Sequence, residues 1–142
     1  AAEVGAGAGE ADGERALSWP LARAGFVTRL HRDVEPEADG HPGLDIAVPE
    51  GSYVRAVARG LVTEVARDSV YGLFVRVRHP EGLASLYAHN GWSFVEPGDS
   101  VRAREVLALS GNSGRSTAPH LHFELLRRGR SVDPAGWLTA GG

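Results

Sequence analysis

Short runs of alternating hydrophobic and polar residues, each bounded by turn-forming residues, follow one another along most of this chain. In the clearest run, residues 73–79 (LFVRVRH), Leu73, Val75 and Val77 share one face of an extended strand and the arginines take the other. The pattern predicts strands over 24–30, 44–48, 53–58, 60–66, 73–79, 83–89, 106–109 and 120–126. We expect the strands 53–58 and 60–66 to pair with each other.

Turn signals separate these runs at intervals of about eight to twelve residues. They include Pro49-Glu50-Gly51, Pro80-Glu81-Gly82 and Glu96-Pro97-Gly98-Asp99. No segment has a convincing helical stripe of apolar residues. Short strands at this spacing predict an all-β, mainly antiparallel sandwich or barrel.

The two ends of the chain differ in composition from its centre. Residues 1–16 are mostly Ala, Gly and Glu, so we expect a flexible linker or tail there. We place the folded domain at 17–138 and expect 139–142 to be a frayed C-terminus. The chain has no Met, even at position 1, which suggests a mature or trimmed fragment.

Composition narrows the function classes. The formal charge of −3 gives no reason to expect a nucleic-acid partner, although all fifteen basic residues are Arg. No apolar run approaches the roughly 18 residues of a membrane span. The chain lacks Cys, so any metal must be held by His, Asp or Glu. This lack is compatible with a protein of the cell envelope.

Two histidine motifs carry the candidate chemistry. His120 and His122 are two apart on a predicted strand, so both imidazoles face the same way and Leu121 points into the core. His41 and Asp45 are four apart, and the Pro-Gly pair between them favours an extended segment over a helix. Imidazoles and a carboxylate form a ligand set that zinc accepts, with one position left for water. We therefore predict a hydrolytic zinc enzyme.

The ordered series of motifs resembles the lysostaphin-type (LytM-like) metallo-endopeptidases, which are zinc enzymes that cut peptide bonds in bacterial peptidoglycan. The similarity covers roughly 19–137, nearly the whole of the expected folded domain. It implies a small antiparallel β-sheet core, of the duplicated hybrid motif type, with a groove between loops. The motifs are His-x-Gly-x-Asp at 41–45, Tyr87-Ala88-His89, Gly98-Asp99-Ser100-Val101, Gly111-Asn112-Ser113-Gly114, His120-Leu121-His122-Phe123-Glu124 and Asp133-Pro134.

The resemblance also assigns roles to individual residues. It implies that His41, Asp45 and His122 hold one Zn²⁺ per chain, and that His89 and His120 act on substrate and water. A neutral imidazole beside a zinc-activated water can accept its proton. We assign this base role to His120 and give His89 the oxyanion and positioning role.

Several neighbouring residues have more than one interpretation. Tyr87 is two residues from His89, so we expect it to share that strand face and line the groove. His79 is either a satisfied structural residue or a support for the site. Glu124 either orients one of the site histidines or pairs with an arginine, and Arg115 contacts either a substrate carboxylate or solvent. For the tryptophans we favour packing in the core and at its boundary: Trp19, Trp92 and Trp137.

The chain departs from the family ahead of the first ligand. Residues 28–32 read TRLHR where the family commonly has Phe-Gly-x-Arg, and the loop 33–40 that follows is acidic. This difference concerns one groove wall and substrate preference, and it leaves the metal ligands unchanged.

Three functions remain open at this point. The first is a zinc endopeptidase that trims peptidoglycan stem peptides or cross-links in the envelope, periplasmic or extracellular. The second is a non-catalytic module that activates a cell-wall amidase or anchors an envelope complex. The third is a zinc peptidase aimed at a protein or at a competitor's wall, such as a secreted lysin. An upstream domain or a regulatory partner remains open, and the upstream sequence would distinguish the functions, since a coiled coil there favours the regulator and a repeat module the lysin.

Overall fold

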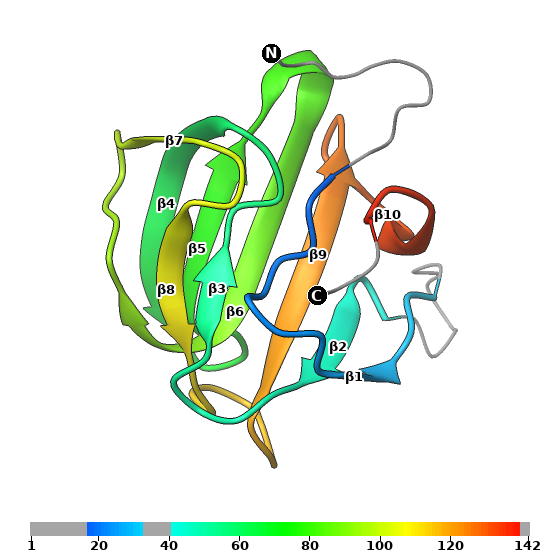
Figure 1. The fold of residues 1–142 in the computed structure, drawn as a ribbon, viewed down its shortest axis with the longest axis vertical. Coiled ribbons are helices and arrows are strands. Elements are labelled where there is room, and N and C mark those ends of the chain that lie inside the picture. Colours follow the sequence, from blue (N-terminus) through cyan, green and yellow to red (C-terminus); the bar gives the residue numbers. More distant parts are fainter. Residues whose placement is uncertain (1–16, 33–40, 140–142) are drawn as a thin grey trace.

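A computed structural model describes residues 17–32 and 41–139 of the chain, and it consists of ten short β-strands with no α-helix in these ranges (Figure 1). Single 3₁₀ turns occur at Pro80–Gly82 and Pro134–Gly136. The strands are β1 (Phe26–Arg29), β2 (Leu44–Ala47), β3 (Tyr53–Arg55), β4 (Gly60–Asp68), β5 (Gly72–Arg78), β6 (Leu83–Ser93), β7 (Ser100–Val101), β8 (Val106–Ser110), β9 (His120–Arg127) and β10 (Arg130–Val132).

All strand pairs in the sheet are antiparallel, which confirms the predicted fold class. The main path runs β1-β2-β9-β6-β5-β4-β7, with β10 at the side of β9. The long strand β6 pairs with β5 and β9, and its last residues pair with β8, which in turn pairs with β3. In this way β3 and β8 branch from the main path and help to enclose one face of the sheet (Figure 1).

The enclosed face holds the main hydrophobic core. Its centre is a row of directly paired residues across four strands, in which Leu44 faces Phe123, Phe123 faces Tyr87 and Tyr87 faces Val75. All four are at most 3% exposed. Because directly opposed residues point to the same side of a sheet, alternate residues of β9 and β2 must point to the opposite face.

That opposite face carries a smaller apolar cluster of Phe74, Leu86 and Ala88. Ala88 is paired with His122, and His122 with Asp45, so the next row of the sheet combines an apolar residue with two groups that can bind metal. The sheet therefore separates the main core from the candidate site by the thickness of one backbone layer.

Each predicted strand has a counterpart, although 53–58 is shortened to β3 and the short strands β7 and β10 were not predicted. The predicted pairing of 53–58 with 60–66 is wrong. Strand β3 pairs with β8, and β4 pairs with β5 and β7. Between β3 and β4, Ala56 and Val57 are buried, and Ala56 exchanges backbone hydrogen bonds with Glu105 and Arg104, at 2.9 and 2.7 Å. A tight hairpin between β3 and β4 would expose this segment to solvent and would break the hydrogen bonds of Ala56. The connection therefore does not turn β4 back onto β3.

The expected role of the tryptophans is confirmed for two of them. Trp19 and Trp137 pack against the main core. Trp92 is 61% exposed, so the core-packing prediction is wrong there. It follows the point where β6 changes partner from β9 to β8, and its cross-strand neighbour Leu109 is only partly buried.

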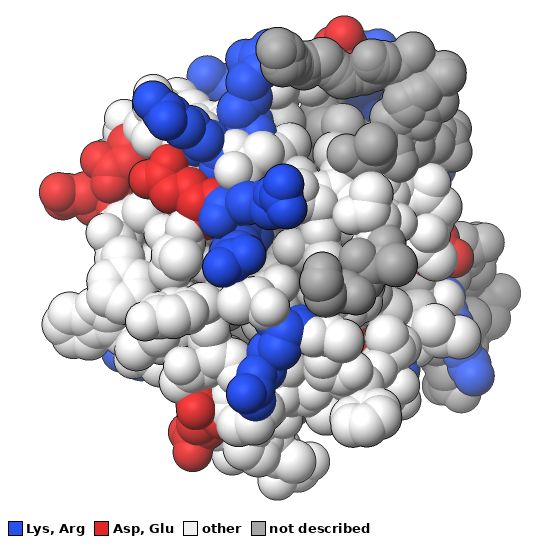
Figure 2. All heavy atoms as spheres, viewed as in Figure 1, with Lys and Arg blue, Asp and Glu red and all other residues white. Residues whose placement is uncertain are grey.

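The predicted tail 1–16, most of the frayed end 139–142 and the acidic loop 33–40 lie outside the described residues, and the domain limits 17 and 138 stay a prediction. Backbone hydrogen bonds of 2.8 Å join Leu17 to Trp137 and Thr139 to Leu17. In the part of the chain that is described, no helix has the length and apolar character needed to cross a membrane. On the face shown in Figure 2, basic side chains lie in a broken band from the top to the lower middle, and acidic side chains lie beside this band at the left.

His79 is a buried structural residue, as one of its two interpretations predicted. Its Nδ1–H donates to the carbonyl of Arg59 at 2.7 Å, and its Nε2 lies 2.7 Å from the Ser85 hydroxyl. Ser85 Oγ is 2.8 Å from the hydroxyl of Tyr87, which accepts the Val57 N–H. Burial is the main cause that lowers the pKa of His79, although its bond to the Arg59 carbonyl opposes this. The ring is therefore neutral in the folded protein.

We expect the free energy of unfolding to fall as the pH decreases below about 6.5, because the unfolded chain then binds a proton that buried His79 does not. In His79→Gln this contribution is absent. The variant should be less stable than the wild type at pH 7.5, and the difference should narrow at pH 5. Urea unfolding at the two pH values measures it, and a difference independent of pH contradicts the assignment.

Candidate metal centre

Strands β2 and β9 bring the first two candidate ligands together through their register. Asp45 is the direct cross-strand partner of His122, and Ala47 is the partner of His120. His120 and His122 share a face, and Leu121 is fully buried in the main core, as the alternation predicted. The Nδ1 atom of His122 lies 2.6 Å from Asp45 Oδ1.

The third candidate ligand, His41, approaches from the extended segment before β2. Its Nε2 lies 3.3 Å from Asp45 Oδ2, and its Nδ1–H donates to the carbonyl of Leu30 at 2.9 Å. Gly43 makes this approach possible, because a Cβ there would lie 2.8 Å from the His122 ring and would collide with the carbonyl of Phe123.

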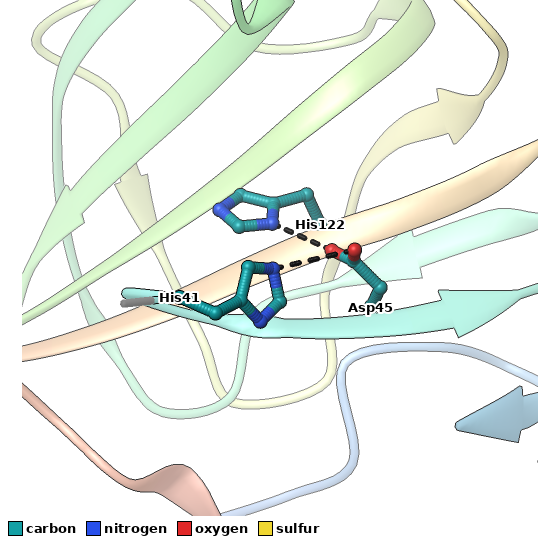
Figure 3. A group of neighbouring side chains, drawn as sticks. All are labelled: His41, Asp45 and His122. Carbon is teal, nitrogen blue, oxygen red and sulfur yellow. Dashed lines mark hydrogen bonds and ion pairs between the residues drawn. The ribbon is translucent and has the colours of Figure 1, made fainter. Parts of the chain in front are cut away.

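Together the three side chains form a cluster that could hold a metal ion (Figure 3). One ligand atom from each of His41, Asp45 and His122 lies within 4.8 Å of the others. The hydrogen bonds fix which nitrogen each imidazole presents. His41 presents Nε2, because its Nδ1 is protonated toward Leu30, and His122 presents Nδ1, because its Nε2–H donates to Glu124 Oε2 at 2.9 Å.

The electrostatics of the cluster also fit a cation. Burial raises the pKa of Asp45, but the hydrogen bond from His122 and the nearby histidine charges outweigh this and lower it. Burial disfavours the charged form of His122, but the carboxylates of Asp45 and Glu124 prevail and raise its pKa to about 9. A positive charge is thus stabilised between two carboxylates, and two imidazoles with a carboxylate are a donor set suited to zinc.

His89 reaches the same face through an irregularity in β6. Between the pairs Val75–Tyr87 and Leu73–Asn90, strand β6 contains one residue more than β5, which is a β-bulge. His89 lies in this bulge with φ 66°, a left-handed conformation. The bulge turns its side chain away from the core face that strict alternation would have given it.

The bulge also overturns the prediction that Tyr87 shares a face with His89 and lines the groove. Tyr87 is fully buried in the main core and tilts against Phe123, with ring centroids 5.3 Å apart. The prediction assumed a period of two, and the extra residue between these two side chains breaks that period.

The rings of His89 and His120 stand side by side, with centroids 4.7 Å apart. In both rings Nδ1–H donates to a backbone carbonyl, that of Ser113 for His89 at 2.7 Å and that of Ala118 for His120 at 2.9 Å. Both rings therefore leave Nε2 unprotonated when neutral, and His120 Nε2 lies 3.8 Å from Asp45 Oδ1. Burial is the main cause that lowers the pKa of His89, so this ring stays neutral near pH 7.

Some contacts of the site had no signal in the sequence. Glu124 accepts from His122, which confirms one of its two interpretations, but it also accepts the hydroxyl of Tyr71, a turn residue that no motif singled out. The carbonyls of Leu30 and Ser113 fix the tautomers of two histidines, and a sequence cannot reveal a role of the backbone. Arg115 is exposed, and its contact with substrate stays a prediction.

The loop that holds His89 depends on a close approach of two glycines. Gly72 has φ 62°, and a Cβ there would collide with Ser113 Oγ and lie 2.6 Å from the nitrogen of Gly114. The Ser113 hydroxyl also accepts the Leu73 N–H and donates to the Asn90 carbonyl. Displacing this segment therefore moves the carbonyl that orients His89.

We expect Gly72→Ala to lower the catalytic rate while zinc content stays unchanged. The matched control is Gly98→Ala, since Gly98 has φ 99° and open space around its Cβ position. Both variants bear the left-handed strain, about 1–2 kcal/mol, but only Gly72→Ala shifts Ser113. Equal rates in the two variants, measured with zinc content and unfolding curves, would contradict the positioning role of this loop.

Fold and site together define a class of protein: a small antiparallel β-sheet domain whose sheet face carries a candidate hydrolytic metal centre, with two imidazoles beside it. Residues 39–134 match peptidase family M23. The chain belongs to this family, which confirms the resemblance to lysostaphin-type peptidases.

Two curated relatives illustrate the range of functions around this chain. It is 44% identical over 94 residues to the DD-carboxypeptidase/endopeptidase Mpg of Neisseria meningitidis, covering 66% of this chain and 22% of Mpg. It is 42% identical over 120 residues to the murein hydrolase activator EnvC of Escherichia coli, covering 84% of this chain and 28% of EnvC. The chain thus spans about a quarter of the length of these relatives.

Solved structures show the same fold. A zinc-containing peptidase from Vibrio cholerae superimposes with a TM-score of 0.75 at 31% identity, covering 82% of this chain and 38% of that chain. The catalytic domain of lysostaphin from Staphylococcus simulans superimposes with a TM-score of 0.68 at 26% identity, covering 76% and 87% of the two chains.

Proposed function

We propose that this domain is a zinc-dependent endopeptidase that hydrolyses peptide bonds in peptidoglycan stem peptides or cross-links. The observation that carries the proposal is that the candidate ligands and two further histidines meet at one place on the sheet. His41, Asp45 and His122 come from two distant segments and place their ligand atoms within 4.8 Å, and the rings of His89 and His120 lie beside them. A purely structural role for these histidines does not require three of their ring nitrogens to face the one carboxylate of Asp45.

In this proposal His41, Asp45 and His122 hold one Zn²⁺ per chain. When bound, zinc acts as a Lewis acid and lowers the pKa of a water molecule to roughly 7. The protein's part is to fix the ligands in advance. Leu30 orients His41, Glu124 orients His122, and Asp45 is held ionised by the histidines around it.

His120 is the proposed general base. Its Nε2 is unprotonated in the neutral ring and lies on the ligand side of the site, 3.8 Å from Asp45 Oδ1. Its position allows it to take a proton from the attacking water and pass it to the leaving amine. His89 is kept neutral by burial, so its Nε2 accepts a hydrogen bond and does not donate one. This favours positioning of water or substrate by His89 over stabilisation of an oxyanion.

The substrate class rests on the relatives. Mpg is named a DD-carboxypeptidase/endopeptidase, and ShyA of Vibrio cholerae, 36% identical to this chain over 115 residues, is named a peptidoglycan DD-endopeptidase. Peptidoglycan peptides as substrate place the protein in the cell envelope, periplasmic or extracellular. Because the matched part makes up only 22% of Mpg and 28% of EnvC, we also propose that a further domain or a regulatory partner controls access to the site.

A second candidate function follows from one observation, the 42% identity with a murein hydrolase activator. In that case the domain binds and activates a cell-wall amidase, or anchors an envelope complex, without hydrolysis. The complete set of ligand-type and catalytic-type histidines favours the peptidase, because an activator does not need free imidazole nitrogens beside a metal cluster.

A digest of purified peptidoglycan sacculi separates the two functions. The domain is incubated with sacculi with and without a zinc chelator, and mass spectrometry identifies the released muropeptides. The peptidase predicts chelator-sensitive loss of cross-linked species with defined new termini, absent in His122→Ala. Bound zinc without release from any sacculus chemotype favours the activator.

A further inference from the structure

Tyr71 lies at the turn between β4 and β5, beside the metal cluster but outside every motif of the family resemblance. The Asp68 carboxylate holds this turn by accepting the backbone N–H groups of Val70 and Tyr71 at 2.8 and 2.6 Å. The backbone of Tyr71 is thereby fixed close to β6, where its carbonyl accepts the N–H of His89 at 2.8 Å.

The side chain of Tyr71 makes two contacts with the metal cluster. Its ring stacks on the ring of His122, with centroids 5.7 Å apart and an interplanar angle of 25°. Its hydroxyl donates to Glu124 Oε2 at 2.5 Å. The same oxygen accepts the Nε2–H of His122 at 2.9 Å, so one carboxylate oxygen is shared by the tyrosine and the candidate ligand.

This sharing sets the orientation of His122. The Glu124 side chain is only 6% exposed, so water does not readily replace a lost partner. With the hydroxyl of Tyr71 in place, Oε2 stays at the edge of the His122 ring, Nε2 keeps its proton, and Nδ1 points at Asp45. His41 is oriented differently. Its Nδ1–H donates to the backbone carbonyl of Leu30, which needs no second side chain to hold it in place.

We propose that Tyr71 is a positioning residue of the metal centre, acting through Glu124 to hold His122 in the orientation that binds zinc through Nδ1. The inference rests on the proposed zinc site but not on peptidase activity. Partners that orient a metal-binding histidine typically contribute about 10- to 100-fold in metal affinity. We expect the loss of the Tyr71 hydroxyl to weaken zinc binding by an amount in this range.

The test compares zinc dissociation constants, measured by competition with a fluorescent chelator, for wild type, Tyr71→Phe, Glu124→Gln and the double variant. Tyr71→Phe keeps the ring on His122 and the carbonyl that accepts from His89. Tyr53→Phe is the matched control, because Tyr53 is 51% exposed and lies in β3. Thermal unfolding of the metal-free variants monitors the fold.

If Tyr71 acts through Glu124, the double variant binds zinc as weakly as Glu124→Gln alone, and Tyr53→Phe binds as the wild type. In proton NMR of the zinc-bound protein, the Nε2–H signal of His122 exchanges faster with solvent in Tyr71→Phe. Unchanged affinity in Tyr71→Phe, or losses that add in the double variant, overturns the inference. If the wild type itself binds no zinc, the proposed metal centre is overturned together with the role of Tyr71. If the wild type binds zinc and only the prediction for Tyr71→Phe fails, the metal centre stands and the positioning role does not.

Discussion

Zinc content should fall from about one ion per chain to background when Asp45 or His122 is replaced by alanine, and cleavage should disappear with it. Each substitution removes one of the three donors that lie within 4.8 Å. A tetrahedral site that keeps one position for water has only three protein ligands, so it does not retain zinc tightly on two. Metal analysis after gel filtration, together with the sacculus digest, measures both effects.

Asp45→Asn refines this prediction. The amide keeps the size of the side chain but removes the charge that sits 2.6 Å from His122 Nδ1 and 3.3 Å from His41 Nε2. We expect zinc loss here too, without the packing change that alanine introduces. His31→Ala is the control, because this variant also removes an imidazole, but one whose ring contacts the Ser131 hydroxyl and is not part of the metal cluster. Zinc near one per chain in Asp45→Asn or His122→Ala would contradict the ligand assignment.

The parts of the site that the sequence predicted are those that follow from regular strand geometry. The period of two in 120–122 places both imidazoles on one face, and the structure has Leu121 in the core between them. The Pro-Gly pair after His41 requires an extended segment, and the structure brings His41 Nε2 to Asp45 Oδ2. Strand alternation and the Pro-Gly signal were sufficient to predict these side-chain directions, because each motif lies within a single strand or in the segment that leads into it.

The parts that could not be predicted depend on pairing between distant segments. That Asp45 faces His122 is a property of the register of β2 and β9, for which the sequence contains no local signal. The bulge at His89 reverses the direction of its side chain, so His89 and Tyr87 lie on opposite faces although regular alternation predicts one shared face. Tyr71 enters the site only because the β4–β5 turn folds against β6, which no motif indicates.

His89→Ala and His120→Ala are expected to keep one zinc per chain and to lose about 10² to 10⁴-fold in kcat. Neither ring supplies a ligand in the proposed site, and each is held by a backbone carbonyl that remains in the variant. Zinc content and turnover of a synthetic cross-linked peptide test this. Turnover unchanged in both variants removes the catalytic assignment, while zinc loss in either one moves that histidine into the ligand set.

Rescue by added imidazole separates the two roles. If His120 takes the proton from water, imidazole at a concentration that leaves the wild-type rate unchanged should restore part of the rate of His120→Ala. The His120 side chain is 17% exposed, which gives a small base a route to the vacated position. His89 is 5% exposed and stays neutral, and its proposed work is to position a hydrogen-bond donor, which a diffusing base does not reproduce. Rescue of His89→Ala alone would therefore exchange the two assignments.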